Sequence, residues 1–330
     1  MKQNETLIAI NDGVFQPDLG PGRNPPGIVM AANEQRFTAA HYQEPLTAYA
    51  VGWRDPENLE MLLDDLFPGV QVGRRFEFKS ATNAEAFLAE TNSDDIRQIG
   101  ASFKRVEYKG SSVTDKTLNK GLTIRIDHDD TIGDGWREQA VERLKMRLLR
   151  SEIIRGIAIL AANDTNANKS WTTSAGNPDG DLRDMTVAGG DSAGLDNNII
   201  ILGKTAWNAR ASCYEAANTP YAGVAAGLTP DGLAAKLGVD KVRVVKPRYQ
   251  SAAATKTAVL GLLVYGYFAE ANMSKDDPSS VKRFWTPTDA GKFRVFMQEF
   301  DKFTDISVEH YSNIICTSTV GIRQLTISPS

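Results

Sequence analysis

Two periodicities meet in the middle of the chain. Over residues 118–127, apolar side chains at even positions such as Leu122 and Ile126 alternate with polar side chains at odd positions. This period of two predicts a strand with one buried face. After an acidic turn, residues 136–162 contain no proline and a single glycine, Gly156. That segment predicts one helix of about 40 Å. A strand that leads into a long exposed helix is typical of a protein that holds its neighbours, and it does not resemble the wall of an active site.

The predicted helix has two chemically different sides. Leu149, Ile153, Ile157 and Leu160 recur at helical spacing and predict a buried stripe. Basic residues outnumber acidic ones along the same segment. Four of them are candidate contacts for nucleic-acid phosphate or for an acidic neighbour: Arg143, Lys145, Arg147 and Arg150. The alternative is a solvated charged face, which needs no partner.

A protruding β-hairpin is predicted over residues 69–127. Residues 69–80 alternate between apolar and polar positions, as residues 118–127 do. The tip of the hairpin is expected to contain a short helix within 83–101 and a strand-like segment at 103–108. Its cations and aromatic rings are candidate contacts between subunits, namely Arg74, Arg75, Phe76, Phe78 and Lys79. For the two phenylalanines, packing in the core of the chain itself is the alternative.

The segments before the hairpin have clear boundaries. Residues 1–40 are rich in Pro, Gly, Asn and Gln, which predicts an extended arm that is ordered only where it lies on something else. A short helix follows between Asp55, which can cap it, and Pro68, which stops it. The apolar stripe of this helix is formed by Leu59, Leu62, Leu63 and Leu66.

After the long helix the pattern changes to α/β. Residues 163–196 are polar and predict a loop. Strands are then expected at 198–202, 239–245 and 258–265, and helices at 204–217 and 231–237. Aromatic-rich β segments follow at 283–287, 293–300 and 313–327. The fold class predicted for the whole chain is therefore α+β, with a distinct α/β lobe in its middle part.

Composition narrows the classes of function. The chain has 330 residues, 42% hydrophobic and 24% charged, as in ordinary globular proteins. A net charge of −4 excludes a dominant basic surface but leaves room for a local one. Cys213 and Cys316 are expected to be buried thiols and not a disulfide framework. No signal-peptide region follows Met1 and no apolar run is long enough to cross a bilayer, so we expect a soluble protein without a membrane partner.

One motif suggests catalysis, but its context does not fit. Residues 190–194 match the G-x-S-x-G motif of serine hydrolases, with Ser192 in the nucleophile position. That motif requires a strand before it and a helix after it, whereas here a predicted loop precedes it and a strand follows. A serine hydrolase that uses Ser192 is therefore kept only as the alternative from another functional class.

Metal and cofactor sites are not indicated. The acidic turn from Asp127 to Asp134 could bind a hard cation, but carboxylates before a helix are also favoured by the helix dipole, and Asp134 can serve as the N-cap. His41, His128 and His310 have no metal-ligand spacing. No phosphate-binding or dinucleotide-binding motif is present. We therefore expect no catalytic residue, no cofactor and no metal, and a protein that is not an enzyme.

The order of the predicted elements resembles that of a known family. The resemblance rests on the hairpin strands 69–80 and 121–127, the helix from Arg137 onward, the segment 198–207 and the ending 314–325. In this order the chain is similar to the major capsid proteins of tailed bacteriophages. These proteins have the Hong-Kong-97-like fold, which encapsulin shells share.

The resemblance implies a division of the chain. Residues 1–40 would form the N-terminal arm, 41–68 the start of the peripheral domain and 69–127 the extended loop. The spine helix (134–162) and more of the peripheral domain would lie within 128–194. The axial domain would then cover 195–265, and the β segment of the peripheral domain with the C-terminus 266–330.

The resemblance also implies a function. The chain would self-assemble into pentamers and hexamers of an icosahedral phage head that encloses double-stranded DNA. An encapsulin-like nanocompartment, which holds protein cargo, is the alternative within the same fold. The implied partners are further copies of the chain, portal and scaffolding proteins, a decoration protein and non-specifically bound DNA. The implied location is the virion, after assembly in the cytoplasm of a bacterial host.

Overall fold

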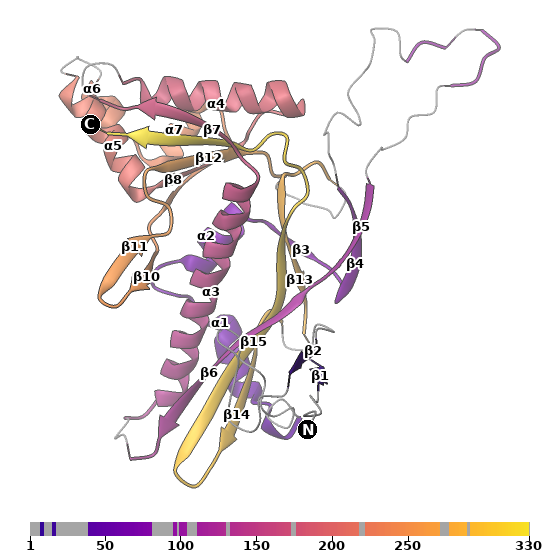
Figure 1. Cartoon of the computed structure of the whole chain (residues 1–330), viewed down its shortest axis with the longest axis vertical. Coiled ribbons are helices and arrows are strands. Elements are labelled where there is room, and N and C mark those ends of the chain that lie inside the picture. The colour runs from indigo at the N-terminus through magenta and orange to yellow at the C-terminus, as the bar shows by residue number, and fades with distance from the viewer. Residues whose placement is uncertain are drawn as a thin grey trace, which may run out of the picture.

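The computed structural model describes residues 7–9, 15–17, 39–80, 95–97, 99–103, 111–129, 133–172, 176–217, 222–270, 277–288 and 291–329. Most of the predicted N-terminal arm, most of segment 83–101, in which a short helix was predicted, and most of the strand-like segment 103–108 lie outside these residues. The described part is elongated (Figure 1). An α/β lobe lies at one end, a long helix and long strands run away from it, and a two-stranded arm projects to one side.

A long sheet is built around strand β15 (Phe303–Cys316). On one side β15 pairs along ten residues with β6 (Leu118–Asp127), and on the other side with β13 (Val281–Thr286) and β14 (Arg294–Glu299). The short β3 (Gly69–Gln71) pairs with β13 in parallel. The bounds predicted for the strand at 118–127 are confirmed, and its apolar even-numbered residues pack against the main core.

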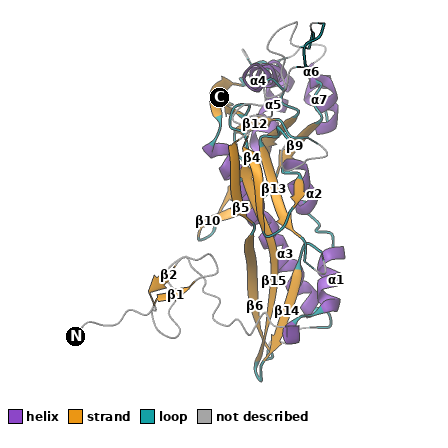
Figure 2. Cartoon of the chain, turned by 90° about the vertical axis from the view of Figure 1, so that its right-hand side faces the viewer, coloured by secondary structure: helices purple, strands orange, loops and turns teal. Residues whose placement is uncertain are grey.

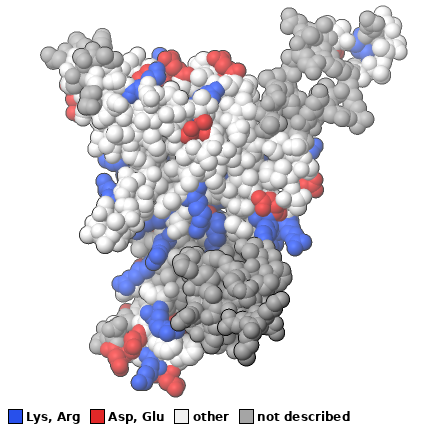
Figure 3. Space-filling model, viewed as in Figure 1, with Lys and Arg blue, Asp and Glu red and all other residues white. Residues whose placement is uncertain are grey.

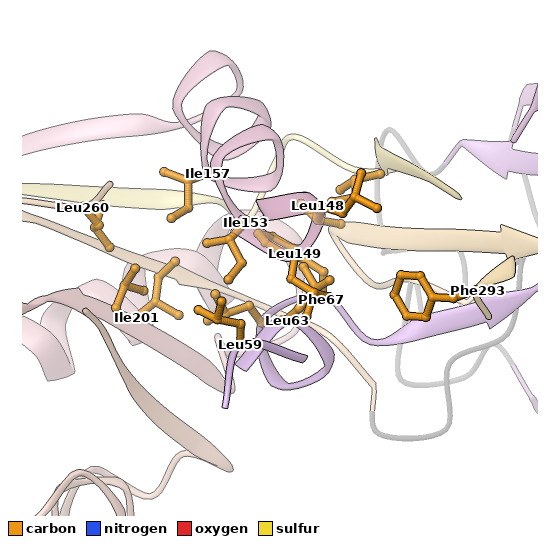
Figure 4. Packing of buried hydrophobic residues seen from close by; sticks show 14 of the residues in the cluster. Leu59, Leu63, Phe67, Leu148, Leu149, Ile153, Ile157, Ile201, Leu260 and Phe293 are labelled. Carbon is orange, nitrogen blue, oxygen red and sulfur yellow. The ribbon is translucent and has the colours of Figure 1, made fainter. Parts of the chain in front are cut away.

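The long helix α3 (Trp136–Ala162) lies against this sheet and has the predicted bounds. It packs on α1 (Glu44–Gly52) and α2 (Leu59–Leu66). In Figure 4 the apolar side chains of α3 point toward α2 and toward Ile201 and Leu260 of the lobe, so one continuous core joins the helix to the lobe. A Cβ on Gly156 would lie 2.2 Å from the ring of Phe67, and glycine is therefore required where this ring meets the helix.

The predicted cap of α2 is confirmed in a modified form. The Asp55 carboxylate accepts hydrogen bonds from the backbone N–H groups of Leu59 (2.7 Å) and Glu60 (3.2 Å). These are orphan donors of the first helical turn, so the side chain acts as a cap although α2 begins only at Leu59. Pro56 therefore lies before the helix.

The α/β lobe contains a five-stranded sheet in the order β7-β16-β12-β8-β9. Its strands are β7 (Thr165–Ser170), β8 (Ile199–Gly203), β9 (Lys241–Val245), β12 (Leu263–Tyr267) and β16 (Arg323–Ser328). Its helices are α4 (Pro178–Ala193), α5 (Lys204–Ala216), α6 (Ala222–Ala226) and α7 (Pro230–Leu237). The predictions for α5, α7 and β8 are confirmed to within one residue at each end.

Two sequence predictions for this region are wrong. Residues 163–196 are not a loop, because they contain β7 and α4. The segment 313–327 is not one strand, because β15 ends at Cys316 and β16 begins at Arg323 in the other sheet, between β12 and β7. The lobe therefore also includes residues 165–193 and 323–328.

The remaining strands form three separate two-stranded sheets. In the projecting arm β4 (Arg75–Ser80) pairs with β5 (Ser111–Lys116), and β5 continues through Thr117 into β6. An exposed hairpin on the lobe joins β10 (Arg248–Ala252) to β11 (Thr255–Ala258). Near the N-terminus β1 (Leu7–Ala9) pairs with β2 (Phe15–Pro17), and the short η2 (Ala39–His41) precedes α1. Within the part of the chain that the structure describes, no helix is long and apolar enough to span a membrane.

Candidate assembly surfaces

The arm is rooted in an aromatic cluster. The ring of Phe284 on β13 lies 4.4 Å from the ring of Phe76 and 5.4 Å from that of Phe78, centroid to centroid. All three side chains are buried, together with Val70. The prediction of Phe76 and Phe78 as contacts between subunits is therefore corrected, since both rings face inward from alternate positions of β4 onto β13. Their role is to fix the base of the arm.

The cationic side chains of the arm lie near this aromatic cluster. Arg74 and Arg75 are exposed, and the guanidinium of Arg74 lies over the ring of Tyr311, 5.0 Å from its centroid. Lys79 is half-buried and already interacts within the chain. Arg74 and Arg75 therefore remain available at the surface for a neighbour's carboxylates, whereas Lys79 has an intramolecular role as well.

Three large apolar side chains at the tip of the arm are exposed to solvent. Ile96, Ile99 and Phe103 are 71%, 105% and 75% exposed, and Arg97 lies over the Phe103 ring at 5.0 Å. These residues are not among the contacts predicted from the sequence. The available signal was the recurrence of apolar residues inside a segment predicted to protrude. Clustered apolar exposure on a projection marks an interaction surface.

The outer face of α3 is only partly as predicted. Arg143 and Arg147 are exposed, and within the described residues neither has an ion-pair partner. Arg150 is half-exposed and pairs with Glu57. On the face seen in Figure 3, Lys and Arg side chains gather across the middle of the molecule, below the lobe. A local basic surface thus exists despite the net negative charge.

Lys145 does not belong to this basic face. Its side chain is only 1% exposed, and its ammonium group donates to the carbonyl oxygens of Ala50 (2.8 Å) and Trp53 (2.9 Å). The Glu60 carboxylate lies 2.9 Å away and neutralises the charge. The prediction that Lys145 contacts nucleic acid is therefore wrong, because this ammonium satisfies the carbonyls at the end of α1.

A buried charge network joins α3 to the long sheet. Glu152 on α3 accepts hydrogen bonds from Lys120 of β6 (2.8 Å), from Ser312 of β15 (3.1 Å) and from Arg155, while His310 lies 3.5 Å away. Burial alone would raise the pKa of Glu152, but the hydrogen bonds and charges of His310 and Lys120 outweigh it and hold the pKa well below its usual value. Glu152 is therefore a buried carboxylate held ionised by its partners.

Acid is expected to destabilise the chain through His310. Burial lowers the pKa of His310 below its ordinary value of 6.5, and the contact with Glu152 offsets this only in part. Below about pH 6.5 the unfolded chain then binds a proton that the folded chain does not, so the free energy of unfolding falls as pH falls. Denaturation midpoints at pH 7.5 and 5.5 should differ in the wild type, and the difference should shrink in His310→Gln. The exposed His128→Gln is the matched control, and an unchanged difference in His310→Gln would contradict the assignment.

The catalytic alternative finds no support in the geometry. Ser192 lies in the last turn of α4, where its hydroxyl donates to the Ala188 carbonyl oxygen (3.1 Å) and contacts Arg323. A nucleophile elbow instead requires a strand that turns into a helix at the serine. Among the described residues, no cluster of His, Cys, Asp and Glu could hold a metal ion. Cys213 and Cys316 are both free thiols.

The predicted capping role of Asp134 is also wrong. Gly135, in the left-handed region at φ 87°, is the residue that precedes α3, and no side chain caps the helix there. At the start of the acidic turn, the Asp127 carboxylate instead accepts a hydrogen bond from the backbone N–H of Asp129 (3.0 Å). Glycine tolerates the left-handed conformation that the chain needs to enter α3 from this turn.

The comparison with solved structures identifies the architecture. No family model and no curated protein sequence matches the chain. A phage-related protein from Bordetella bronchiseptica superimposes with a TM-score of 0.63 at 18% identity, over 86% of this chain and 96% of that one. The chain has the Hong-Kong-97-like fold.

Two further solved structures match with lower TM-scores. The capsid of cyanophage P-SCSP1u is 12% identical, with a TM-score of 0.45 over 81% of this chain and 88% of that one. An encapsulin complex from Synechococcus elongatus is 10% identical, with a TM-score of 0.45 over 84% and 89%. Because a shared fold does not determine function, function has to be argued from the surfaces described above.

Proposed function

We propose that the chain is a major capsid protein that assembles into the pentamers and hexamers of an icosahedral phage head. The observation that carries this proposal is the arm, in which the paired strands β4 and β5 lead to a segment that exposes Ile96, Ile99 and Phe103. Within the described residues these three side chains take no part in a hydrophobic core. The arm suits a subunit that reaches across to a neighbour and buries the tip there.

The energetics favour assembly by many modest contacts. Full burial of a large apolar side chain contributes about 1.5–3 kcal/mol, so each arm tip supplies several kcal/mol to a contact. Each subunit of a closed shell makes such contacts with more than one neighbour, and linked contacts reinforce one another. The aromatic cluster around Phe284 supports this by fixing the arm at its base, which limits the entropy lost when the tip docks.

The proposed content of the shell is double-stranded DNA. Arg143 and Arg147 on α3, the proposed spine helix, are exposed cations that suit weak contact with phosphate regardless of sequence. Portal, scaffolding and decoration proteins are proposed as further partners, and the virion, after assembly in a bacterial cytoplasm, as the location. Nuclease-protected DNA in purified particles is expected, whereas particles filled only with a protein cargo would indicate the encapsulin-like alternative.

Ile99→Asp is expected to abolish assembly while leaving the subunit folded. The side chain is fully exposed, so the substitution should change the free energy of unfolding by no more than about 0.5 kcal/mol. In a docked tip, however, it would bury an unpaired carboxylate, which is strongly unfavourable. Light scattering and electron microscopy measure assembly, and circular dichroism measures folding.

Val224→Asp supplies the matched control. Val224 lies on α6 of the lobe and is 71% exposed, but it is not part of the arm. Shells are expected from this variant and not from Ile99→Asp. If both variants assemble as the wild type does, the arm tip is not an assembly contact and the proposed function loses its main support.

A further inference from the structure

The outer edge of β6 is a long strand edge that no described strand of the chain covers. β6 pairs with β15 along ten residues, and within the described residues it pairs with no other strand. Figure 2 shows β6 at the margin of the long sheet, with β15 and β14 to one side of it. Strand edges of this length are templates for pairing with another chain.

Hydrogen-bond directions show which groups lie on this edge. The His128 N–H donates to the Lys302 carbonyl oxygen (2.8 Å), so even-numbered residues of this strand direct their backbone groups to β15. On the other side, the Thr117 N–H donates to the Arg74 carbonyl oxygen (3.0 Å) at the base of the arm. Along β6, which follows Thr117, the outward N–H and C=O groups therefore belong to the odd-numbered residues, namely Asn119, Gly121, Thr123, Arg125 and Asp127.

Along β5, which precedes β6, the same edge is occupied by β4. β5 and β6 form one continuous strand through Thr117, and β4 pairs with the β5 part on the side that is open along β6. The Lys116 carbonyl confirms this geometry, because it points the other way and accepts from the Asn313 side chain of β15 (3.1 Å). The open edge is thus a direct continuation of a position that the chain already fills with a strand.

Two usual protections of an exposed edge, a proline and a β-bulge, are lacking in β6. β6 contains no proline, and its register with β15 runs without a bulge. Its charged side chains are also engaged within the chain. Arg125 pairs with Asp305 (2.9 Å), and the Asp127 carboxylate accepts from the Asp129 N–H. Within the described residues the charge on Arg125 is therefore ion-paired, and the carboxylate of Asp127 lies at the last position of the strand.

We infer that a strand from a second copy of this chain completes the outer edge of β6, in line with β4. The occupant is a second copy because the chain carries strand-forming segments without a place in either large sheet. Among the described residues, β1 and β2 pair only with each other. A two-stranded sheet alone is marginal in water. The inference rests on the proposed self-assembly, which brings copies close together, and β-strand addition is a known mode of such recognition.

Thr123→Pro tests the pairing directly. It removes an outward N–H that no described strand of this chain uses, and proline is tolerated at such a position of an edge strand. Thr123→Ala is the matched control, because both variants lose the hydrogen bond between the hydroxyl groups of Thr123 and Ser307 (2.7 Å) while only alanine keeps the N–H. Thr123→Pro should need an about tenfold higher subunit concentration to assemble than Thr123→Ala, the equivalent of one lost hydrogen bond. Equal assembly of the two variants would overturn the inference.

Hydrogen exchange on the wild type gives an answer even where the proline variant fails to fold. The amides of Gly121, Thr123 and Arg125 should exchange freely in unassembled subunits and become protected in assembled particles. Amides of even-numbered residues such as Ile124 should be protected in both, because they bond to β15. If particles form while the odd-numbered amides still exchange freely, the edge pairing is wrong and the proposed function stands. If the wild type forms no assemblies, both fail.

Discussion

Glu152→Ala is expected to lower the free energy of unfolding by about 3–5 kcal/mol. The carboxylate is buried at the junction of α3, β6 and β15, and it is the shared partner of Lys120, Arg155 and Ser312. Removing it leaves the Lys120 ammonium buried opposite His310 with no negative charge between them. An uncompensated buried charge costs far more than an exposed ion pair contributes.

Chemical denaturation of unassembled protein measures this effect. The Ile99→Asp background keeps subunits apart, so that assembly does not add to the apparent stability. Glu142→Ala, on the same helix, removes one hydrogen bond from the Tyr49 hydroxyl and serves as the matched control, with an expected cost of about 1 kcal/mol. Similar costs for the two variants would show that the network around Glu152 does not hold the helix to the sheet.

Phe284→Ala is expected to cost about 3–5 kcal/mol and to release the arm as well. Phe284 is fully buried and contacts the rings of both Phe76 and Phe78, which are the inward residues of β4. A cavity at this position removes the surface on which β4 rests. Because the arm is proposed to dock on a neighbour, its release should also suppress assembly.

The matched control is another buried phenylalanine of the long sheet. Phe296→Ala removes a ring of the same size from β14, away from the arm. Both variants should lose stability, but only Phe284→Ala should speed hydrogen exchange of β4 and β5 in the folded subunit. If β4 and β5 exchange at wild-type rates in Phe284→Ala, the aromatic cluster does not anchor the arm.

Hydrophobic periodicity predicted those helices and strands that are specified by a pattern within their own sequence. The bounds of α3 and β6 follow from the apolar residues of each segment, because both elements bury one continuous face of their own sequence. α5, α7 and β8 were found for the same reason. Since the order of these elements is what the Hong-Kong-97-like fold shares across distant chains, the fold class was predictable as well.

Elements stabilised by distant partners were missed. α4 contains three glycines and four aspartates, so its composition resembles a loop, although Asn177 and Pro178 do form a regular helix start. Most of β15 carries buried polar residues such as Asp305 and Ser307. These are satisfied by Arg125 and Thr123 across the strand pair, which no local pattern reveals.

The side chains at the surfaces were predicted less well than the backbone. Lys145 and Glu152 lie at helical spacing from Leu148 and Leu149, within the apolar stripe, and that spacing was the available sign that both are buried. The apolar tip of the arm is visible in the sequence as Ile96, Ile99 and Phe103. Only the structure shows that nothing in the described part of the chain covers them.

The proposal that this chain builds shells is tested most directly by electron microscopy of the purified wild-type protein, with particle mass from light scattering. The arm, its apolar tip and the open edge of β6 predict closed icosahedral particles of uniform size, containing nuclease-protected DNA when produced together with the partner proteins proposed above. A protein that stays a monodisperse monomer at high concentration, with or without a scaffolding protein, would contradict the proposal.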